Sequence, residues 1–248
     1  FKQKTAYEIR LSLVGSEMCI RDRLIERGQA ERRRACQRLV RHALGYFHGY
    51  MRRCRLIAFD PRTVAAETVR RPCVLVANHP TLVDATAILS VFAETVCVVK
   101  SPLYRGRALG RLLRSCWYID SGAIAGLAGG SVLPEALERL REGTSVLIFP
   151  EGTRSRGGRE MGAFKRGAFE IAIRAGVPVV PILISCDPPI LSKEAPWYRA
   201  PRRVPQHRLQ LLPPLDPQEW KGRSRAMAAH VQQLFQDRLD APAAASPR

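Results

Sequence analysis

The fold is decided by residues 73–84, which read CVLVANHPTLVD. The first five residues are apolar and have the length of one buried strand, and a polar turn that carries a histidine and an aspartate follows them. Similar apolar runs recur at 96–99, 145–149 and 177–184, and a further strand is expected at 208–212. Since each run is shorter than an ordinary helix, these segments predict strands.

Helical patterns separate the strands. Residues 131–141 and 164–175 carry apolar positions at helical spacing, and each segment is soon followed by a glycine that can end a helix. A third helix is expected after Asp216, which would be its N-cap. Its buried stripe would consist of Met227, Val231, Leu234 and Phe235. Strands that alternate with helices predict an α/β fold with a largely parallel central sheet flanked by helices.

Four segments are expected along the chain. Residues 1–23 resemble translated sequencing-adapter read-through, notably in FKQKTAYEI and LVGSEMCIRDR, and are therefore expected to be an artefact that is disordered and packs against nothing. Residues 24–57 are expected to form an amphipathic basic helix, and residues 58–240 the main domain. Residues 241–248 are expected to form a disordered tail.

The basic helix has one apolar face. Its members recur at steps of three and four residues and are Cys36, Leu39, Val40, Ala43, Leu44, Phe47, Tyr50 and Met51. Arginines crowd the flanks, and long basic side chains beside an apolar face are typical of a helix that lies in a membrane interface. The alternative is a helix that docks on its own domain, because surface helices are generally amphipathic.

Charge is the strongest compositional signal, since the 248 residues carry a formal net charge of +18. Such a field attracts nucleic acid, anionic lipid headgroups or phosphorylated substrates. Nucleic acid is the disfavoured partner, because only 7% of the residues are aromatic. The seven cysteines are scattered without a CxxC pair, which argues against a zinc site and favours a reducing compartment. No run approaches the roughly 18 apolar residues expected of a membrane-spanning helix.

The polar turn after the first strand carries His79 and Asp84. Pro80 suits the first position of a helix, which would leave His79 outside the helix and Asp84 one turn inside it. The carboxylate could then bond to one ring nitrogen of His79 and leave the other nitrogen free to take a proton. The pair predicts a general base, although this spacing also arises by chance in a histidine that caps a helix.

A second polar segment, residues 149–155, reads FPEGTRS and also leaves the carboxyl end of an expected strand. Sites in open parallel sheets form at this edge. Gly152 permits close approach of the backbone to a ligand, and Arg154 with the hydroxyls on either side of it supplies donors suited to a phosphate. Glu151 is expected to orient Arg154 or to bind a substrate hydroxyl. In isolation, such a loop would be no more than a tight turn with an exposed arginine.

Together the two segments resemble the glycerolipid acyltransferase family, typified by the 1-acylglycerol-3-phosphate acyltransferases. NHPTLVD fits the Asn-His-x4-Asp block of that family, and FPEGTRS fits its Phe-Pro-Glu-Gly-Thr-Arg-Ser block. VPVVPI at residues 177–182 matches the strand that follows in the family, and FKRGA at 164–168 is similar to its Phe-Lys-x-Gly segment. The resemblance covers about residues 72–184 and implies that residues 58–240 form an acyltransferase domain.

The resemblance also implies residue roles. His79 and Asp84 would be catalytic, with His79 removing a proton from an acceptor hydroxyl as that oxygen attacks a thioester. The substrate-binding residues would be Asn78, Glu151, Gly152, Thr153, Arg154, Ser155, Lys165, Arg166 and Lys100. Neither a metal nor a cofactor is implied, and no serine or cysteine stands in a recognisable nucleophile setting beside His79.

The partners follow from the same resemblance. The acyl donor would be a thioester on coenzyme A or acyl carrier protein, and the acceptor a lysophospholipid, in the first place 1-acylglycerol-3-phosphate. With the basic helix, the resemblance implies a peripheral or monotopic enzyme on an anionic membrane surface, at the cytoplasmic face of a bacterial inner membrane.

One block departs from the family pattern. The second motif of the family often ends a strand with Ile-Asp-Arg, whose arginine helps to hold the acceptor phosphate, and here Ser121 follows Asp120. Lys100, Arg105 and Arg107 lie nearby in the sequence and could substitute for it. NHPTLVD also resembles the acyltransferases of aryl-polyene clusters. The alternative acceptor is therefore a non-phosphatidate lipid, such as an aryl-polyene or amino-lipid alcohol.

Overall fold

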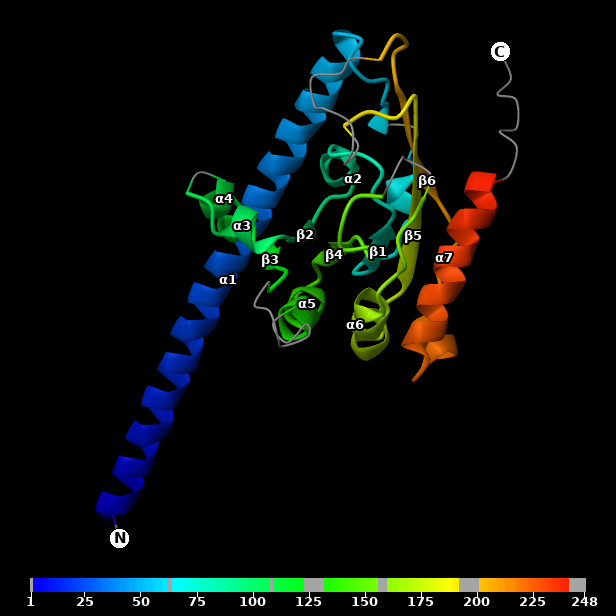
Figure 1. The fold of residues 1–248 in the computed structure, drawn as a ribbon. Coiled ribbons are helices and arrows are strands. Elements are labelled where there is room, and N and C mark those ends of the chain that lie inside the picture. The colour runs from blue at the N-terminus through cyan, green and yellow to red at the C-terminus, as the bar shows by residue number, and fades with distance from the viewer. Residues whose placement is uncertain are drawn as a thin grey trace.

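A computed structural model of the protein describes residues 2–61, 64–107, 109–122, 132–155, 160–191 and 201–240. Side chains are described from residue 28 onward. Within these ranges, six strands form one sheet in the order β3-β2-β4-β1-β5-β6 (Figure 1). The strands are β1 (Val74–Ala77), β2 (Thr95–Val99), β3 (Ile119–Asp120), β4 (Ser145–Ile148), β5 (Val179–Asp187) and β6 (Gln206–Leu211).

The sheet is parallel except at one edge. β1 pairs in parallel with β4 and β5, and β2 does so with β3 and β4, whereas β6 is antiparallel to β5. All four residues of β1 are buried, which is characteristic of a strand covered on both faces. The predicted α/β fold with a largely parallel sheet is confirmed.

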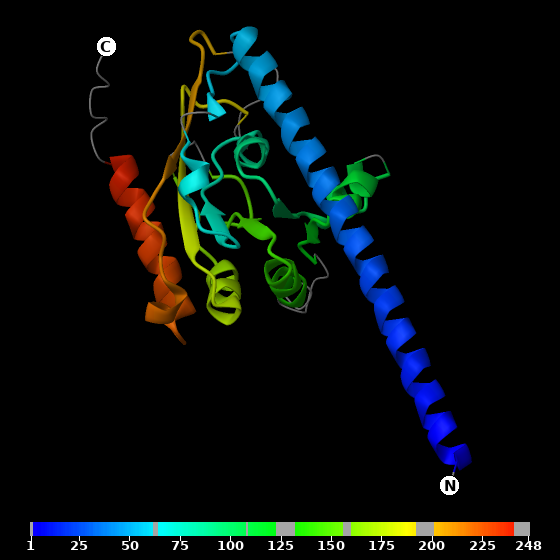
Figure 2. The ribbon, with the colours of Figure 1, turned by 180° about the vertical axis from the view of Figure 1, so that it is seen from behind.

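Helices cover both faces of the sheet. They are α1 (Lys2–Arg53), α2 (Asp84–Val91), α3 (Ser101–Tyr104), α4 (Leu109–Ser115), α5 (Val132–Arg141), α6 (Gly167–Ala175) and α7 (Ser224–Asp240), with short 3-10 turns at Ala66–Thr68 and Pro217–Trp220. α5, α6 and α7 pack side by side on one face, and α1 packs on α2 at the other face (Figures 1 and 2).

α2 begins later than Pro80, which was expected to be its first residue. The helix starts at Asp84, and residues 81–83 form a turn before it. The Asp84 carboxylate accepts from the backbone N–H of Thr81, three residues earlier. This contact tightens the turn and brings Asp84 back toward His79.

The C-terminal helix also begins later than expected. Asp216 caps the 3-10 turn Pro217–Trp220, because its side chain accepts from the backbone N–H of Gln218. The chain then turns at Gly222, where φ is +75°, and α7 starts at Ser224. Asp216 is therefore the cap of a short turn rather than of the long helix. The expected stripe of α7 does face the core, with Met227, Val231, Leu234 and Phe235 packed there.

α1 shows no boundary near residue 23. Its backbone is helical from Lys2 to Arg53, whereas residues 1–23 were expected to be disordered. These residues contain no proline and only one glycine, Gly15, so the local sequence has no strong helix stop. The side chains of residues 1–23 lie outside the described part of the structure, so the expectation that this segment packs against nothing stays a prediction. Residues 241–248 also lie outside it, so the expected disordered tail stays a prediction too.

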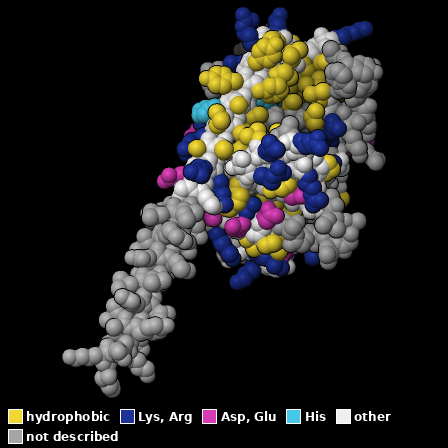
Figure 3. All heavy atoms as spheres, turned by 90° about the vertical axis from the view of Figure 1, so that its left-hand side faces the viewer, with side chains coloured by type: hydrophobic (Ala, Val, Ile, Leu, Met, Phe, Trp, Pro, Cys, Tyr) yellow, Lys and Arg dark blue, Asp and Glu magenta, His cyan; other side chains and the backbone are white. Residues whose placement is uncertain are grey.

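The apolar positions of α1 are divided between two surfaces. Cys36, Val40 and Leu44 pack against the core of the domain, whereas Leu39 and Tyr50 are 68% and 65% exposed. The docked surface also buries Gln37 and His48, and exposed Tyr46 and Phe47 adjoin Tyr50 on the outer surface. The helix therefore docks on its own domain and also presents apolar side chains outward (Figure 3), and its expected place in a membrane interface stays a prediction.

None of the described helices is both long enough and apolar enough to cross a membrane.

Candidate active site

The two polar segments meet at the carboxyl edge of the sheet. β1 and β4 are parallel neighbours, with Val76 beside Ile148, so the turns that follow them open on the same edge. The backbone N–H of Ser155 donates to the carbonyl oxygen of His79 at 2.8 Å. The sequence prediction that these segments lie together is therefore confirmed.

His79 and Asp84 form the expected contact. Nδ1 of His79 lies 2.8 Å from Oδ2 of Asp84, and because an ionised carboxylate can only accept, Nδ1 carries the proton. The ring of His79 stacks on Phe149 with 4.2 Å between the ring centroids. The His79 side chain is 19% exposed and that of Asp84 is fully buried, so Nε2 of His79 is the nitrogen that can meet a substrate.

The Asp84 carboxylate accepts four hydrogen bonds although it is buried. Oδ2 accepts from His79 and from the Thr81 N–H at 2.7 Å, and Oδ1 accepts from the Thr81 hydroxyl at 2.5 Å and from His207 Nε2 at 2.8 Å. Burial acts to raise the pKa of Asp84, but the bonds and charges of His207 and His79 outweigh it, so the pKa lies below its usual value. Asp84 is therefore an anion at neutral pH.

His207 is a member of this site that sequence reasoning missed. It lies on β6, 123 residues after Asp84, so no local spacing connects the two. The one sequence signal is the alternation of β6, which places His207 and Leu209 on the buried side and Gln206, Arg208 and Gln210 on the exposed side. That alternation could have shown a buried histidine, but not its partner.

Glu151 holds the two segments together. Its Oε1 accepts from the backbone N–H of His79 at 3.0 Å and from the hydroxyl of Ser155 at 2.8 Å, and its Oε2 accepts from the N–H of Gly162 at 2.9 Å. Glu151 is 6% exposed. Because both carboxylate oxygens bond to the protein, Glu151 orders the loops, whereas it was expected to orient Arg154 or to bind a substrate hydroxyl. Binding of a substrate by Glu151 stays a prediction.

Two other expected substrate contacts are internal. The Asn78 side chain lies against β5, where Nδ2 donates to the carbonyl of Ile184 at 2.9 Å and Oδ1 accepts from its N–H at 2.7 Å. Ser155 is buried and its hydroxyl donates to Glu151. Asn78 thus extends the backbone pairing of β5 beyond the end of β1, and Ser155 closes its own loop, which explains these residue types without a substrate.

The remaining loop residues stand at the surface. Gly152 adopts a φ of +68°, and a Cβ there would lie 3.0 Å from Nζ of Lys165. Arg154 donates through Nη1 to the carbonyl of Leu191 at 2.8 Å and is partly exposed, as is Thr153. Lys165 and Arg166 are exposed at the start of α6. Cationic side chains from two segments therefore surround a loop whose glycine leaves its backbone accessible.

The residues around Asp120 and Ser121, where the sequence departs from the family's second motif, lie farther along the same edge of the sheet. Lys100 is exposed and follows β2, which lies beyond β4 from β1. The guanidinium Nε of Arg105 lies 3.5 Å from Oδ2 of Asp120, and the N–H of Ser121 donates to the carbonyl of Val99. Arg105 is thus paired with Asp120, and Lys100, Arg105 and Arg107 are all exposed.

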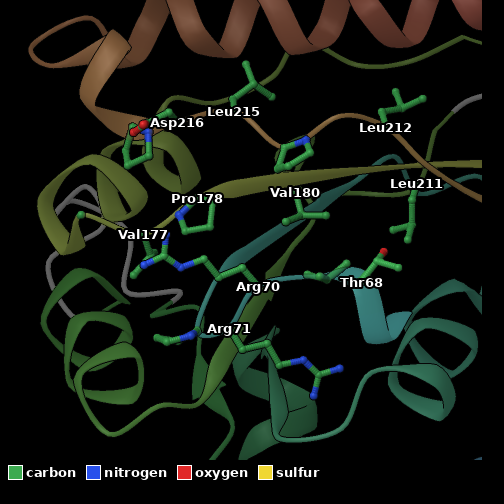
Figure 4. Close-up of a pocket in the computed structure, with 15 residues that line it drawn as sticks. Thr68, Arg70, Arg71, Val177, Pro178, Val180, Leu211, Leu212, Leu215 and Asp216 are labelled. Carbon is green, nitrogen blue, oxygen red and sulfur yellow. The ribbon is translucent and has the colours of Figure 1, made fainter. Parts of the chain in front are cut away.

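A cavity of about 450 Å³ lies at the opposite edge of the sheet (Figure 4). Arg70 and Arg71, which precede β1, line it with Val177 and Pro178, which precede β5. The guanidinium of Arg71 donates to the carbonyl of Ala93 at 2.6 Å. None of the residues predicted for the site lines this cavity, so it is separate from the arrangement around His79.

Comparisons with known proteins agree with the motifs. A family model described as Acyltransferase matches residues 60–185, just over half of the chain. A chloroplastic 1-acyl-sn-glycerol-3-phosphate acyltransferase of Brassica napus, BAT2, is 35% identical over 113 residues, which make up 46% of this chain and 33% of that protein. A 1-acyl-sn-glycerol-3-phosphate acyltransferase of Salmonella typhimurium is 32% identical over 177 residues, which make up 67% of this chain and 66% of that protein.

The fold has a counterpart among solved structures. The crystal structure of the 1-acyl-sn-glycerophosphate (LPA) acyltransferase PlsC from Thermotoga maritima aligns with a TM-score of 0.56 at 19% identity, over 88% of this chain and all of that one. The chain spans only about a third of the length of the plant relative. The match to the family model confirms the resemblance seen in the two motifs, and the chain belongs to the acyltransferase family.

Proposed function

We propose that this protein transfers a fatty acyl group from a thioester, on coenzyme A or acyl carrier protein, to the hydroxyl of a lysophospholipid such as 1-acylglycerol-3-phosphate. The observation that carries the proposal is the His79–Asp84 pair, held by Glu151 against a loop surrounded by cations. The names of the relatives support the choice of acceptor.

His79 acts as the general base. Its Nε2 takes the proton of the acceptor hydroxyl as that oxygen attacks the thioester carbonyl and forms a C–O bond. The buried Asp84 stabilises the resulting imidazolium through Nδ1. When the tetrahedral intermediate collapses, the C–S bond breaks and the departing thiolate takes the proton from His79. The thioester is a co-substrate, and no step requires a metal ion or another cofactor.

The acceptor phosphate lies at the second loop. Lys165 and Arg166 are exposed there and Arg154 is partly so, which gives three cationic side chains around the backbone at Gly152. Guanidinium and ammonium groups form strong charge-assisted hydrogen bonds with phosphate oxygens. Asn78 and Ser155 have internal roles in this proposal.

The acyl acceptor is reached from a membrane surface. Leu82, 57% exposed, belongs to the turn that carries His79, and exposed leucines of α3 and α4 accompany it. The C-terminal end of α1 lies at the same sheet edge, because Ala58 pairs with Gln206, which pairs with Asp187 at the carboxyl end of β5. We therefore propose peripheral binding to the anionic cytoplasmic face of a bacterial inner membrane, which the net charge of +18 favours.

The decisive experiment is transfer of a labelled acyl group from acyl-coenzyme A to 1-acylglycerol-3-phosphate by His79→Ala. The rate is expected to fall by about 10²- to 10⁴-fold, the usual contribution of a general base. The matched control is His230→Ala, which removes an exposed histidine of α7 and should leave the rate unchanged. Transfer by His79→Ala within twofold of the wild-type rate would refute the assignment.

A second acceptor class is motivated by Ser121. The arginine that the family often carries at this position is absent, and Arg105 is paired with Asp120. Acceptors with an amino-lipid or aryl-polyene alcohol should therefore be compared with 1-acylglycerol-3-phosphate at a fixed concentration of one acyl donor. If the amino-lipid or aryl-polyene alcohol is acylated and 1-acylglycerol-3-phosphate is not, the acceptor in our proposal is replaced, and the proposed acyl transfer by His79 stands.

A further inference from the structure

The Asp84 carboxylate lies between two histidines. His79 bonds to Oδ2 and His207 to Oδ1, each at 2.8 Å, and the side chains of both Asp84 and His207 are fully buried. His79 comes from the turn after β1 and His207 from β6, so the two imidazoles approach the carboxylate from segments far apart in the sequence. A carboxylate held from both sides cannot rotate without breaking one of these bonds.

The surroundings of His207 fix which nitrogen faces Asp84. Its Nε2 must carry a proton to bond to the Asp84 anion, and its buried Nδ1 has no hydrogen-bond partner among the described residues. The ring of Phe59 packs edge-on against His207, with centroids 5.5 Å apart. The ring therefore presents its Nε2–H to Oδ1 of Asp84.

Two other titratable groups lie beside this arrangement. His48 of α1 is buried beyond Phe59, and burial, followed by the influence of His207, lowers its pKa to about 4. Cys186 pairs with His207 across β5 and β6, and burial raises the pKa of its thiol to about 12. Both groups are thus neutral at pH 7 and add no charge beside Asp84.

We infer that His207 is a positioning residue for acyl transfer, because its Nε2–H holds Asp84 Oδ1 and so keeps Oδ2 aligned with Nδ1 of His79. The carboxylate is thereby fixed in the orientation in which it can stabilise the imidazolium of His79. This inference rests on the proposed role of His79 as base.

The test compares three variants at positions 207 and 48. His207→Leu fills the space but removes the donor, and its kcat is expected to fall by about 10- to 100-fold with KM within about threefold, as is usual when a group that orients a catalytic residue is lost. His207→Gln retains an N–H that can reach Asp84 and should recover most of the lost kcat. His48→Leu makes the same replacement at a buried histidine that bonds to Thr86 instead, and should keep kcat within about twofold.

The contribution through Asp84 can be isolated in a double-mutant cycle. In the Asp84→Asn background, His207→Leu should reduce kcat by less than about twofold, because the group that it positions is already altered. Circular dichroism and the melting temperature of each variant establish that the compared proteins are folded.

The outcomes separate the two proposals. Wild-type kcat in His207→Leu, equal losses in His207→Leu and His207→Gln, or equal losses in His207→Leu and His48→Leu would each overturn the positioning role while leaving the base assignment intact. Undiminished transfer by His79→Ala would instead refute the base itself.

Discussion

At the scale of single residues, charge is concentrated where the protein can neutralise it by hydrogen bonds. Asp84 accepts four bonds and Glu151 accepts three, and both carboxylates are buried. Buried carboxylates of this kind are costly unless they are paired or hydrogen-bonded, so their partners matter as much as the carboxylates themselves. The bonds of Glu151 lead to a prediction about loop order.

Glu151→Gln should lower the free energy of unfolding by about 1–3 kcal/mol, because its amide nitrogen would face an N–H where a carboxylate oxygen accepted one. Activity should fall with it, since Glu151 bonds to the backbone of His79. Urea denaturation measures the first effect. Ser155→Ala removes a single donor to the same carboxylate and should cost less than Glu151→Gln, and a larger loss in Ser155→Ala would contradict this account.

At the scale of elements, the packing of α1 on α2 brings His48 into the interior. His48 Nε2 lies 3.0 Å from the hydroxyl of Thr86, and the hydroxyl of Thr86 donates to the carbonyl of Val83. Because the Thr86 hydroxyl uses its own proton in this bond, it accepts the hydrogen bond from His48 Nε2. Burial of this neutral histidine lowers its pKa to about 4, so its protonation competes with docking of the helix.

The sign of the resulting pH dependence follows from proton binding. Between the ordinary histidine pKa of about 6.5 and the folded value of about 4, the unfolded chain binds the proton and the folded protein does not, so stability falls as the pH falls through this window. His48→Leu should abolish about 2 kcal/mol of this decline. The check is to measure the unfolding free energies of the wild type and of His48→Leu from pH 7 to pH 4. Parallel curves for the two proteins would contradict this prediction.

The elements also show how far sequence patterns reach. The strands that carry both motifs, and the meeting of the motifs at one edge, follow from short apolar runs in a parallel sheet. His207 could not be placed, because its contact with Asp84 depends on antiparallel pairing of β6 with β5. Asp216 was misplaced because Gly222 interrupts the helix that it was expected to cap.

Side-chain roles were the least predictable feature. Asn78 and Ser155 carry groups that suit a substrate, and only the tertiary structure shows that β5 and Glu151 occupy those groups. The same holds for α1, where one helical stripe contains both Cys36, which packs inward, and Leu39, which is exposed. A pattern of apolar spacing does not distinguish two adjacent surfaces on one helix.

At the scale of the whole molecule, apolar and basic side chains share the end that carries the site. Figure 3 shows hydrophobic side chains gathered along the upper part of α1 with Lys and Arg side chains around them. Tyr46 and Tyr50, which lie near the C-terminal end of α1, are 81% and 65% exposed. An apolar surface with a basic rim is the arrangement of proteins that bind at a membrane interface.

Replacing Tyr46 and Tyr50 together by serine should weaken binding to vesicles that contain phosphatidylglycerol by about tenfold, which corresponds to about 1.4 kcal/mol of lost apolar insertion. The variant should remain folded, because both side chains are exposed. Co-sedimentation with anionic vesicles and with phosphatidylcholine vesicles provides the measurement. Binding of the wild type to anionic vesicles should weaken with salt, and preferential binding to duplex DNA would favour the nucleic-acid alternative instead.

The two surfaces of α1 have a practical consequence for protein production. Removing the helix to obtain a protein that handles well without detergent would take away the buried Gln37 and His48 and leave the Cys116 carbonyl and the Thr86 hydroxyl without these partners. It would also strip the support from α2, whose first residue is Asp84. Surface redesign that changes only the outward side chains, such as Leu39, would spare the docked side. The segment that looks most dispensable for handling is therefore also a structural support of the reacting histidine.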